Sequence, residues 1–214
     1  MTIYNKNITL INVYLHRGNI MTRLTDKQKQ IIEATIEIIS EKSIQGLTIK
    51  NLSKKIGLTE GAIYRHFDSK IEILLTILYS FQNEAKNLLG NYCNSERPAL
   101  EMIEEIFQHH FEYFVARPAV TSVIFSESIF QNDSRLIKEV FRLLEMHEKA
   151  LTCIIVKGQK TKEINANIEA KEFVRIIIGS IRYMVTKWRL LKFEFDLLEE
   201  GRLMLKAIKE LLKS

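Results

Sequence analysis

From Asp26 onward, apolar residues recur every three or four positions along almost the whole chain. Side chains at this spacing share one face of an α-helix, so the pattern predicts a series of amphipathic helices. Only 2 prolines and 8 glycines interrupt the 214 residues, which argues against turn-rich β architectures and against collagen-like or low-complexity sequence. We therefore expect an all-α protein of about nine helices.

Breaks between the expected helices fall at glycines, prolines and capping residues, which favour helix ends. Thr25 or Asp26 caps the first helix, Pro98 fits the first turn of the fifth, and Gly158 is expected to end the seventh. The expected helices span residues 26–42, 48–56, 59–67, 68 or 69 to 88, 98–117, 118–130, 132 or 133 to 156, 167–188 and 194–212.

Charge is distributed unevenly along the chain. The net charge of +5 comes from 31 basic and 26 acidic side chains. Residues 1–70 hold 11 basic and 6 acidic side chains, whereas residues 71–214 hold 20 of each. The whole excess therefore lies in the first third, as in a polyanion-binding module joined to a neutral body.

The domain boundaries follow from this division. We expect a polyanion-binding domain over residues 22–70 and a second, helical domain over residues 71–214. Residues 1–21 lack the helical period. They are expected to be an N-terminal extension, either a disordered arm or sequence that precedes a natural start at Met21.

The most specific feature is the segment GLTIKNLSKKIGLTEGAIYRHF, residues 46–67. Two short helices are expected on either side of Gly57, and Leu58 and Ile63 provide apolar anchors that fix the angle between them. This spacing predicts a helix-turn-helix, whose second helix enters the major groove of DNA.

The second of these helices is suited to close approach. Gly61 and Ala62 are small at its first turn, and Thr59 caps an N-terminus whose N–H groups favour phosphate. Lys70 adds a charge at the start of the next helix. Side chains able to hydrogen-bond phosphate or base follow at Tyr64, Arg65 and His66.

Over about residues 25–85 these residues resemble the TetR family of bacterial transcriptional regulators. The resemblance implies a homodimer on palindromic double-stranded DNA, with helices one to three as the DNA-binding head. It also implies a regulatory body with a ligand cavity, and a four-helix bundle made by the last two helices of two subunits. The matching residues are Gly46-Leu47-Thr48, Leu52, Ile56-Gly57-Leu58, Ala62-Ile63-Tyr64-Arg65-His66-Phe67 and Lys70.

The same resemblance implies which residues face DNA. Glu60 departs from a purely basic surface, because a carboxylate repels phosphate, although it can accept a hydrogen bond from a cytosine amino group. The alternative is a helix-turn-helix-like pair without a DNA role. The implied DNA-facing residues are Thr48, Lys50, Thr59, Glu60, Gly61, Ala62, Tyr64, Arg65, His66 and Lys70.

Aromatic residues gather in the middle of the expected body. Most are expected to pack in the core, and some to line the effector cavity that the resemblance implies. No dense basic cluster lies within the apolar stripes, so an apolar or amphipathic effector is favoured over a sugar phosphate. The candidate ligand-binding residues are Phe107, His110, Phe111, Phe114, Phe125 and Phe141.

Two small residues, Gly179 and Ser180, lie inside the eighth expected helix. Small side chains permit close helix approach, either within the body or between two subunits. In the second case the last two helices pair across the dimer. The candidate interface residues are Ile177, Ser180, Met184, Trp188, Leu205 and Ile208, with Leu198, Met204 and Leu211 extending the apolar seam.

Other functions find little support in the sequence. Two cysteines, Cys93 and Cys153, are too few for a disulfide framework or a four-cysteine zinc site and are expected to be buried or idle thiols. His109 and His110 point about 100° apart on a helix and do not suit one metal ion. No catalytic, phosphate-binding or zinc-binding motif is present, and no apolar run approaches a membrane span. We expect neither cofactor nor metal and no membrane association.

The sequence therefore predicts a cytoplasmic, homodimeric, ligand-responsive DNA-binding regulator, acting as a repressor and not as an enzyme. Two alternatives stay open. One is a DNA-binding architectural or division protein on the same scaffold, without a small effector. The other is a helical enzyme with an incidental N-terminal helix pair.

Overall fold

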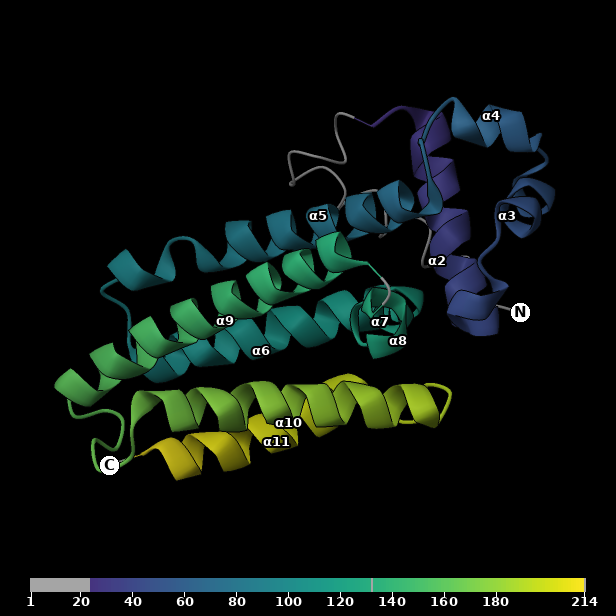
Figure 1. The fold of residues 1–214 in the computed structure, drawn as a ribbon. Helices are drawn as coiled ribbons and strands as arrows, with labels where there is room; N and C mark the ends of the chain where they lie inside the picture. Colours follow the sequence, from purple (N-terminus) through teal and green to yellow (C-terminus); the bar gives the residue numbers. More distant parts are fainter. Residues whose placement is uncertain (1–23, 132, 214) are drawn as a thin grey trace. The chain divides into compact units, whose positions relative to one another are not determined.

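The computed structural model describes residues 24–131 and 133–213, so the expected extension, residues 1–21, lies outside it. Within the described residues the chain forms ten α-helices and one short 3-10 helix, and only an isolated bridge between Ile164 and Lys213 has β character. The all-α class is confirmed (Figure 1). The helices are α2 (Asp26–Gly46), α3 (Ile49–Ile56), α4 (Glu60–Tyr64), α5 (Lys70–Leu89), η1 (Tyr92–Asn94), α6 (Ala99–Ala116), α7 (Pro118–Ile124), α8 (Glu127–Phe130), α9 (Ser134–Lys160), α10 (Ala170–Leu190) and α11 (Leu197–Leu212).

The chain divides into two compact units that do not follow sequence order. The first unit combines the residues up to Glu84 with Ala116–Leu143, and the second combines Ala85–Val115 with the residues from Leu144 onward. Helices α5 and α9 therefore each contribute to both units. The expected boundary at residue 70 concerns the division of function and stays a prediction.

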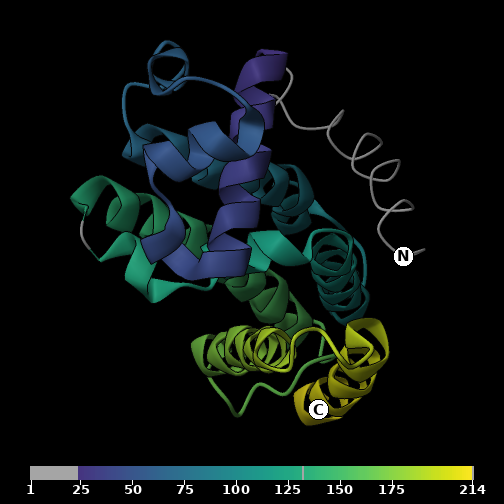
Figure 2. The ribbon, with the colours of Figure 1, turned by 90° about the vertical axis from the view of Figure 1, so that its right-hand side faces the viewer.

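The first unit is built around α2, on which α3 and α7 pack (Figure 2). Thr25 begins α2 with a capping box, in which the Thr25 side chain and the Gln28 side chain each bond the other residue's backbone N–H. The backbone leaves helical geometry at Ser43 (φ 57°), next to the expected end at residue 42. The core of the unit includes Ile31, Ile38, Leu52, Ile63, Phe67, Leu74, Leu78, Val123 and Leu136.

In the second unit, α6, the C-terminal part of α9, α10 and α11 pack on one another, and a distant side chain caps α6. The Glu163 carboxylate accepts hydrogen bonds from the backbone N–H groups of Ala99 (2.7 Å) and Leu100 (2.9 Å). This satisfies two of the N–H groups that a helix start leaves unpaired.

Gly158 does not end the seventh expected helix, because α9 continues to Lys160. A Cβ atom at Gly158 would lie 2.7 Å from side-chain atoms of Ala99 and Ile164. The residue is a glycine because the packing of the second unit leaves no room for a side chain. The expectation that it terminates the helix was wrong.

Several other helix boundaries also differ from the expected ones. Residues 118–130 form two short helices, α7 and α8, interrupted at Phe125 and Ser126, which accounts for the tenth helix. Helix α4 ends at Tyr64 because the chain turns there and buries Phe67 in the core. Helix α10 begins at Ala170 instead of residue 167.

Candidate nucleic-acid interface

Helices α3 and α4 form the expected helix-turn-helix through local hydrogen bonds. The Thr48 hydroxyl accepts from Asn51 N at the start of α3 (3.0 Å), and the Thr59 hydroxyl accepts from Ala62 N at the start of α4 (3.1 Å). Gly57 ends α3 in the left-handed region at φ 67°, which glycine adopts without strain. Three residues thus mark the start of α3, the end of α3 and the start of α4.

The structure exposes most of the residues that the resemblance assigns to DNA. Ala62 is the exception, because only 8% of it is exposed and it packs in the core of the head. His66 and Lys70 are half-buried. The exposed members of the set are Thr48, Lys50, Thr59, Glu60, Gly61, Tyr64 and Arg65.

Gly61 has no structural reason within the described chain to be a glycine. A Cβ atom built at this position meets no other atom within 4 Å, and no positive φ is found there. Gly61 lies in the first turn of α4, directly after Glu60. A requirement for a small residue here can therefore come only from something that approaches α4 from outside.

Polar contacts that the sequence did not reveal hold α4 and α5 in place. The Gln28 amide donates to the backbone carbonyl of His66 at the end of α4 (3.3 Å). The Lys70 Nζ donates to the carbonyl of Leu47 (3.3 Å), which precedes α3, and the Ser69 hydroxyl caps α5. Lys70 therefore joins the start of α5 to the start of α3, in addition to its expected role at a phosphate.

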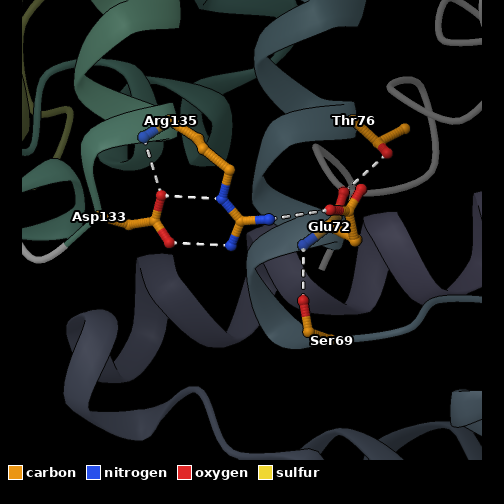
Figure 3. A network of polar contacts seen from close by, with 5 residues as sticks. All are labelled: Ser69, Glu72, Thr76, Asp133 and Arg135. Atoms are coloured by element: carbon orange, nitrogen blue, oxygen red, sulfur yellow. Dashed lines mark hydrogen bonds and ion pairs between the residues drawn. The ribbon is translucent and has the colours of Figure 1, made fainter.

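Helix α5 is also fastened to the start of α9 within the first unit (Figure 3). The Arg135 guanidinium donates to both oxygens of Asp133 (3.1 and 2.9 Å) and to Oε1 of Glu72 on α5 (3.4 Å). The hydrogen bond from Arg135 lowers the pKa of Asp133. Further along, the Gln82 amide donates to the carbonyl of Glu139 (2.8 Å).

The candidate ligand-binding residues are divided between the two compact units. Phe107, Phe111 and Phe114 are buried on α6 in the second unit, where the rings of Phe107 and Phe111 lie edge to face at 6.0 Å. Phe125 and Phe141 belong to the first unit, and 60% of Phe141 is exposed. Within the second unit the structure brings together the four candidates on α6.

His110, the polar candidate on α6, is paired with a histidine that the sequence did not single out. Its Nδ1 lies 2.7 Å from the carbonyl oxygen of Ile106, and its Nε2 lies 3.0 Å from Nε2 of His147 on α9. Since a carbonyl only accepts, Nδ1 of His110 donates and its Nε2 accepts from His147. Burial, with the neighbouring His147, lowers the pKa of His110 to about 3, so its ring is neutral.

The candidate dimer residues divide between core and surface. Ile177 and Trp188 on α10, and Leu205 and Ile208 on α11, are buried within one chain, whereas Ser180 and Met184 are half-buried. The exposed side of α10 carries a different apolar stripe at helical spacing, around an open Gly179. It consists of Ile176, Tyr183 and Leu190, of which 43%, 64% and 78% are exposed.

Two family models together match most of the chain. Residues 31–77 match the model of bacterial regulatory proteins of the tetR family, and residues 84–212 match that of the YsiA-like protein C-terminal region. The chain belongs to the TetR family. It is a DNA-binding transcriptional regulator, as the helix-turn-helix geometry and the family indicate.

Relatives of this TetR-family protein include regulators with different names. It is 22% identical over 177 residues to the fatty acid metabolism regulator protein of Bacillus subtilis, covering 83% of this chain and 91% of that protein. It is also 22% identical over 165 residues to the nucleoid occlusion factor SlmA of Vibrio cholerae, covering 75% and 84%.

Solved structures share the fold. The transcriptional regulator FadR from Bacillus subtilis, in complex with stearoyl-CoA, superposes with a TM-score of 0.70 at 21% identity, over 86% of this chain and 98% of that one. FadR from Bacillus halodurans superposes with a TM-score of 0.75 at 17% identity, over 86% and 95%.

Two further observations concern metal binding and membrane spans. Among the described residues, no group of three or more His, Cys, Asp or Glu side chains is arranged to hold a metal ion. Over the same part of the chain, every helix is too short or too polar to cross a membrane.

Proposed function

We propose that the protein is a cytoplasmic, homodimeric repressor that binds a palindromic operator through α3 and α4 and is released by an acyl thioester. The open Gly61 in the first turn of α4 carries the DNA part of the proposal. It lies among the exposed side chains of Thr59, Glu60 and Arg65. This arrangement lets the start of α4 approach base edges while neighbouring polar groups bond phosphates.

Binding to the DNA upstream of the protein's own coding region tests this part. Arg65→Ala should weaken operator binding, and if Arg65 reads a guanine it should relax one operator position by about 1–3 kcal/mol. Lys160→Ala, which removes an exposed cation from α9, is the matched control and should leave affinity unchanged. Fluorescence anisotropy with operator and scrambled duplexes measures both, and equal losses in the two variants would contradict the assignment.

We infer that two subunits pair through the exposed faces of α10 and α11. Ile176, Tyr183 and Leu190 form the stripe on α10, and Leu203 and Leu211 are exposed on α11. Gly179, with open space above it, allows two helices to approach closely. The buried Ile177, Trp188, Leu205 and Ile208 would support this face from behind.

Tyr183→Asp should convert the dimer to a monomer, because it places a charge in the middle of the stripe. Phe141→Asp is a matched control, since Phe141 is about equally exposed but lies on α9 in the first unit. Sedimentation velocity distinguishes the two outcomes. A Tyr183→Asp protein that remains dimeric would place the interface elsewhere.

The proposed effector is a long-chain acyl thioester, bound in the second unit. Two observations support this class: a relative is the fatty acid metabolism regulator protein of Bacillus subtilis, and a similar solved regulator is in complex with stearoyl-CoA. In this chain the buried Phe107, Phe111 and Phe114 would contact the acyl chain, and His110 would supply a polar group. Phe125 and Phe141 remain candidates from sequence.

Titration of the operator complex with stearoyl-CoA, coenzyme A and stearate tests the effector. Stearoyl-CoA should lower operator affinity by roughly 5- to 150-fold, and operator should lower stearoyl-CoA affinity by the same factor. Similarity to a nucleoid occlusion factor favours a second candidate function, a DNA-binding division protein that needs no small effector. If none of the three compounds changes the affinity for operator DNA, the result would support that second function.

A further inference from the structure

One glutamine side chain joins the start of α2 to the chain that follows α4. The Nε2 of Gln28 donates to the backbone carbonyl of His66 (3.3 Å), 38 positions further along the sequence. Its Oε1 accepts from the backbone N–H of Thr25 (3.0 Å) and from the Thr25 hydroxyl (3.2 Å). Both polar atoms of the amide are therefore used, and all three residues belong to the first compact unit.

Helix α4 depends on its surroundings for its orientation, because it has only 5 residues and a helix this short is not stable by itself. At its start, the Thr59 hydroxyl caps the helix directly after the turn from α3. Beyond its end, the backbone carbonyl of His66 points to a donor on a different helix, the Gln28 amide on α2. The two ends of α4 are thus held by different means, one local and one distant.

The carbonyl that Gln28 binds lies directly after the side chains that we expect to read DNA. Tyr64 and Arg65 are exposed, whereas His66 and Gln28 are half-buried. A shift of the His66 carbonyl moves the backbone that carries Arg65. Because the groups of a binding site must be placed within about 0.5 Å, such a shift is enough to break a contact with a base edge.

We propose that Gln28 is a positioning residue for DNA recognition, which holds the end of α4 at the angle that lets Arg65 contact a base. This role rests on the proposed docking of α4 in the major groove, and Gln28 exerts it through His66 without a contact of its own with DNA. Base contacts give sequence preference, whereas phosphate contacts bind all sequences alike. Loss of the bond from Gln28 to His66 should therefore weaken binding to the operator far more than binding to scrambled DNA.

Two substitutions separate the two contacts of the amide. Gln28→Glu keeps an acceptor oxygen for Thr25, as glutamate does in capping boxes, but places a carboxylate against the His66 carbonyl. Gln28→Lys keeps a donor for the His66 carbonyl and loses the acceptor for Thr25. Gln30→Glu, at an exposed position in the first turns of α2, is the matched control for the added negative charge.

Fluorescence anisotropy with operator and scrambled duplexes gives the ratio of specific to non-specific affinity, and urea unfolding of the full-length protein gives the stability. Gln28→Glu should lower this ratio by about 5- to 150-fold, which corresponds to one base contact of about 1–3 kcal/mol. Its urea midpoint should stay close to that of Gln30→Glu. Gln28→Lys should have a lower urea midpoint, because the cap is lost, and a ratio near that of the wild-type protein.

A double-mutant cycle with Arg65→Ala tests whether Gln28 acts through Arg65. Gln28→Glu should lower the ratio much less in the Arg65→Ala protein than in the wild-type protein, because the base contact is already absent. Additive losses would overturn the proposal, as would equal ratios in Gln28→Glu and Gln30→Glu. A ratio as low in Gln28→Lys as in Gln28→Glu would assign the effect to the cap of α2 and overturn it as well.

The same measurements distinguish a failure of this role from a failure of the proposed function. If Arg65→Ala alone leaves the ratio unchanged, the proposed docking of α4 is wrong. If Arg65→Ala lowers the ratio and Gln28→Glu does not, α4 docks as proposed and Gln28 has no part in positioning it.

Discussion

The helix-turn-helix and the second compact unit are both helical, but their polar side chains act over different distances along the chain. In the helix-turn-helix, Thr48 and Thr59 each accept a hydrogen bond from a backbone N–H three residues later. In the second unit, Glu163 caps a helix that begins more than sixty residues earlier, and His110 pairs with His147. Local contacts can be predicted from neighbouring residues, whereas distant contacts exist only once the chain has packed.

Glycines show the same contrast between the two regions. Gly61 in α4 faces open space, whereas a Cβ atom at Gly201 in α11 would overlap the Phe111 ring. One glycine keeps a surface accessible, and the other allows two helices to pack. Substitution at each position separates a requirement of binding from a requirement of folding.

The largest effect is expected for Gly61→Val. Specific operator binding should fall toward the level of non-specific DNA, a loss of roughly 4–10 kcal/mol, because a branched side chain keeps the start of α4 out of the groove. The free energy of unfolding should change little, since the position is open. Anisotropy with operator and scrambled DNA, beside urea unfolding, measures both. Wild-type affinity in this variant would mean that α4 docks differently.

Gly201→Ala should destabilise the protein by about 1–3 kcal/mol, because the Phe111 ring must shift within a packed core. Gly61→Ala in α4 is the control for unfolding in the absence of DNA, because nothing lies within 4 Å of the added methyl group. The control should be neutral or gain up to about 1 kcal/mol of helix propensity. Urea unfolding measures the free energy of unfolding of both variants. Equal losses of this free energy in the two variants would contradict the close packing of Gly201 against Phe111.

Acid should weaken the protein through His110. The pKa of His110 is about 3 in the folded protein, whereas its ordinary value is 6.5. Between these two pH values the unfolded chain binds a proton at His110 and the folded protein does not. The free energy of unfolding should therefore fall by about 1.4 kcal/mol for each pH unit below 6.5, and this contribution is fully present above 6.5.

His110→Asn should flatten this pH dependence, since an amide does not titrate. His109→Asn, the adjacent control, should keep the slope of the wild-type protein. Urea unfolding at several values between pH 7 and pH 5 measures the slopes. Parallel slopes in His110→Asn and wild type would assign the acid sensitivity to other groups.

The smallest effect is expected for Glu163→Gln, which retains one acceptor oxygen and loses the charge at the start of α6. A loss of about 1–2 kcal/mol of unfolding free energy is expected, as for other helix caps. Glu148→Gln, at an exposed position on α9, should change stability little. Thermal unfolding of the two variants is the measurement, and an unchanged midpoint in Glu163→Gln would show that water replaces the cap.

The head was predictable in detail because its signals are local. Thr48, Gly57 and Thr59 each act on residues no more than four positions away, so their spacing alone indicates two helices and a turn. Ala62 was assigned to the DNA-facing side although it is buried, because smallness suits both a core and a close approach.

The body was predictable only in outline. Its helices follow from their apolar period, but the period does not tell which apolar residue faces a neighbour in the same chain. Ile177 and Trp188 were expected at a subunit interface and are buried within one chain, while Ile176 and Tyr183 on the same helix are exposed. A rotation of about 100° per residue separates these positions, and only packed neighbours select the face.

The amino-acid sequence thus specifies the helices and the helix-turn-helix with its two threonine caps, because these depend on contacts between residues close in the chain. Folding in three dimensions decides which glycines are packed and which histidines share a hydrogen bond. Gly158 and His147 both lie on α9, and their partners Ala99, Ile164 and His110 come from segments between 6 and 59 positions away in the sequence. Such partners depend on the packing of whole helices, which no short stretch of residues encodes.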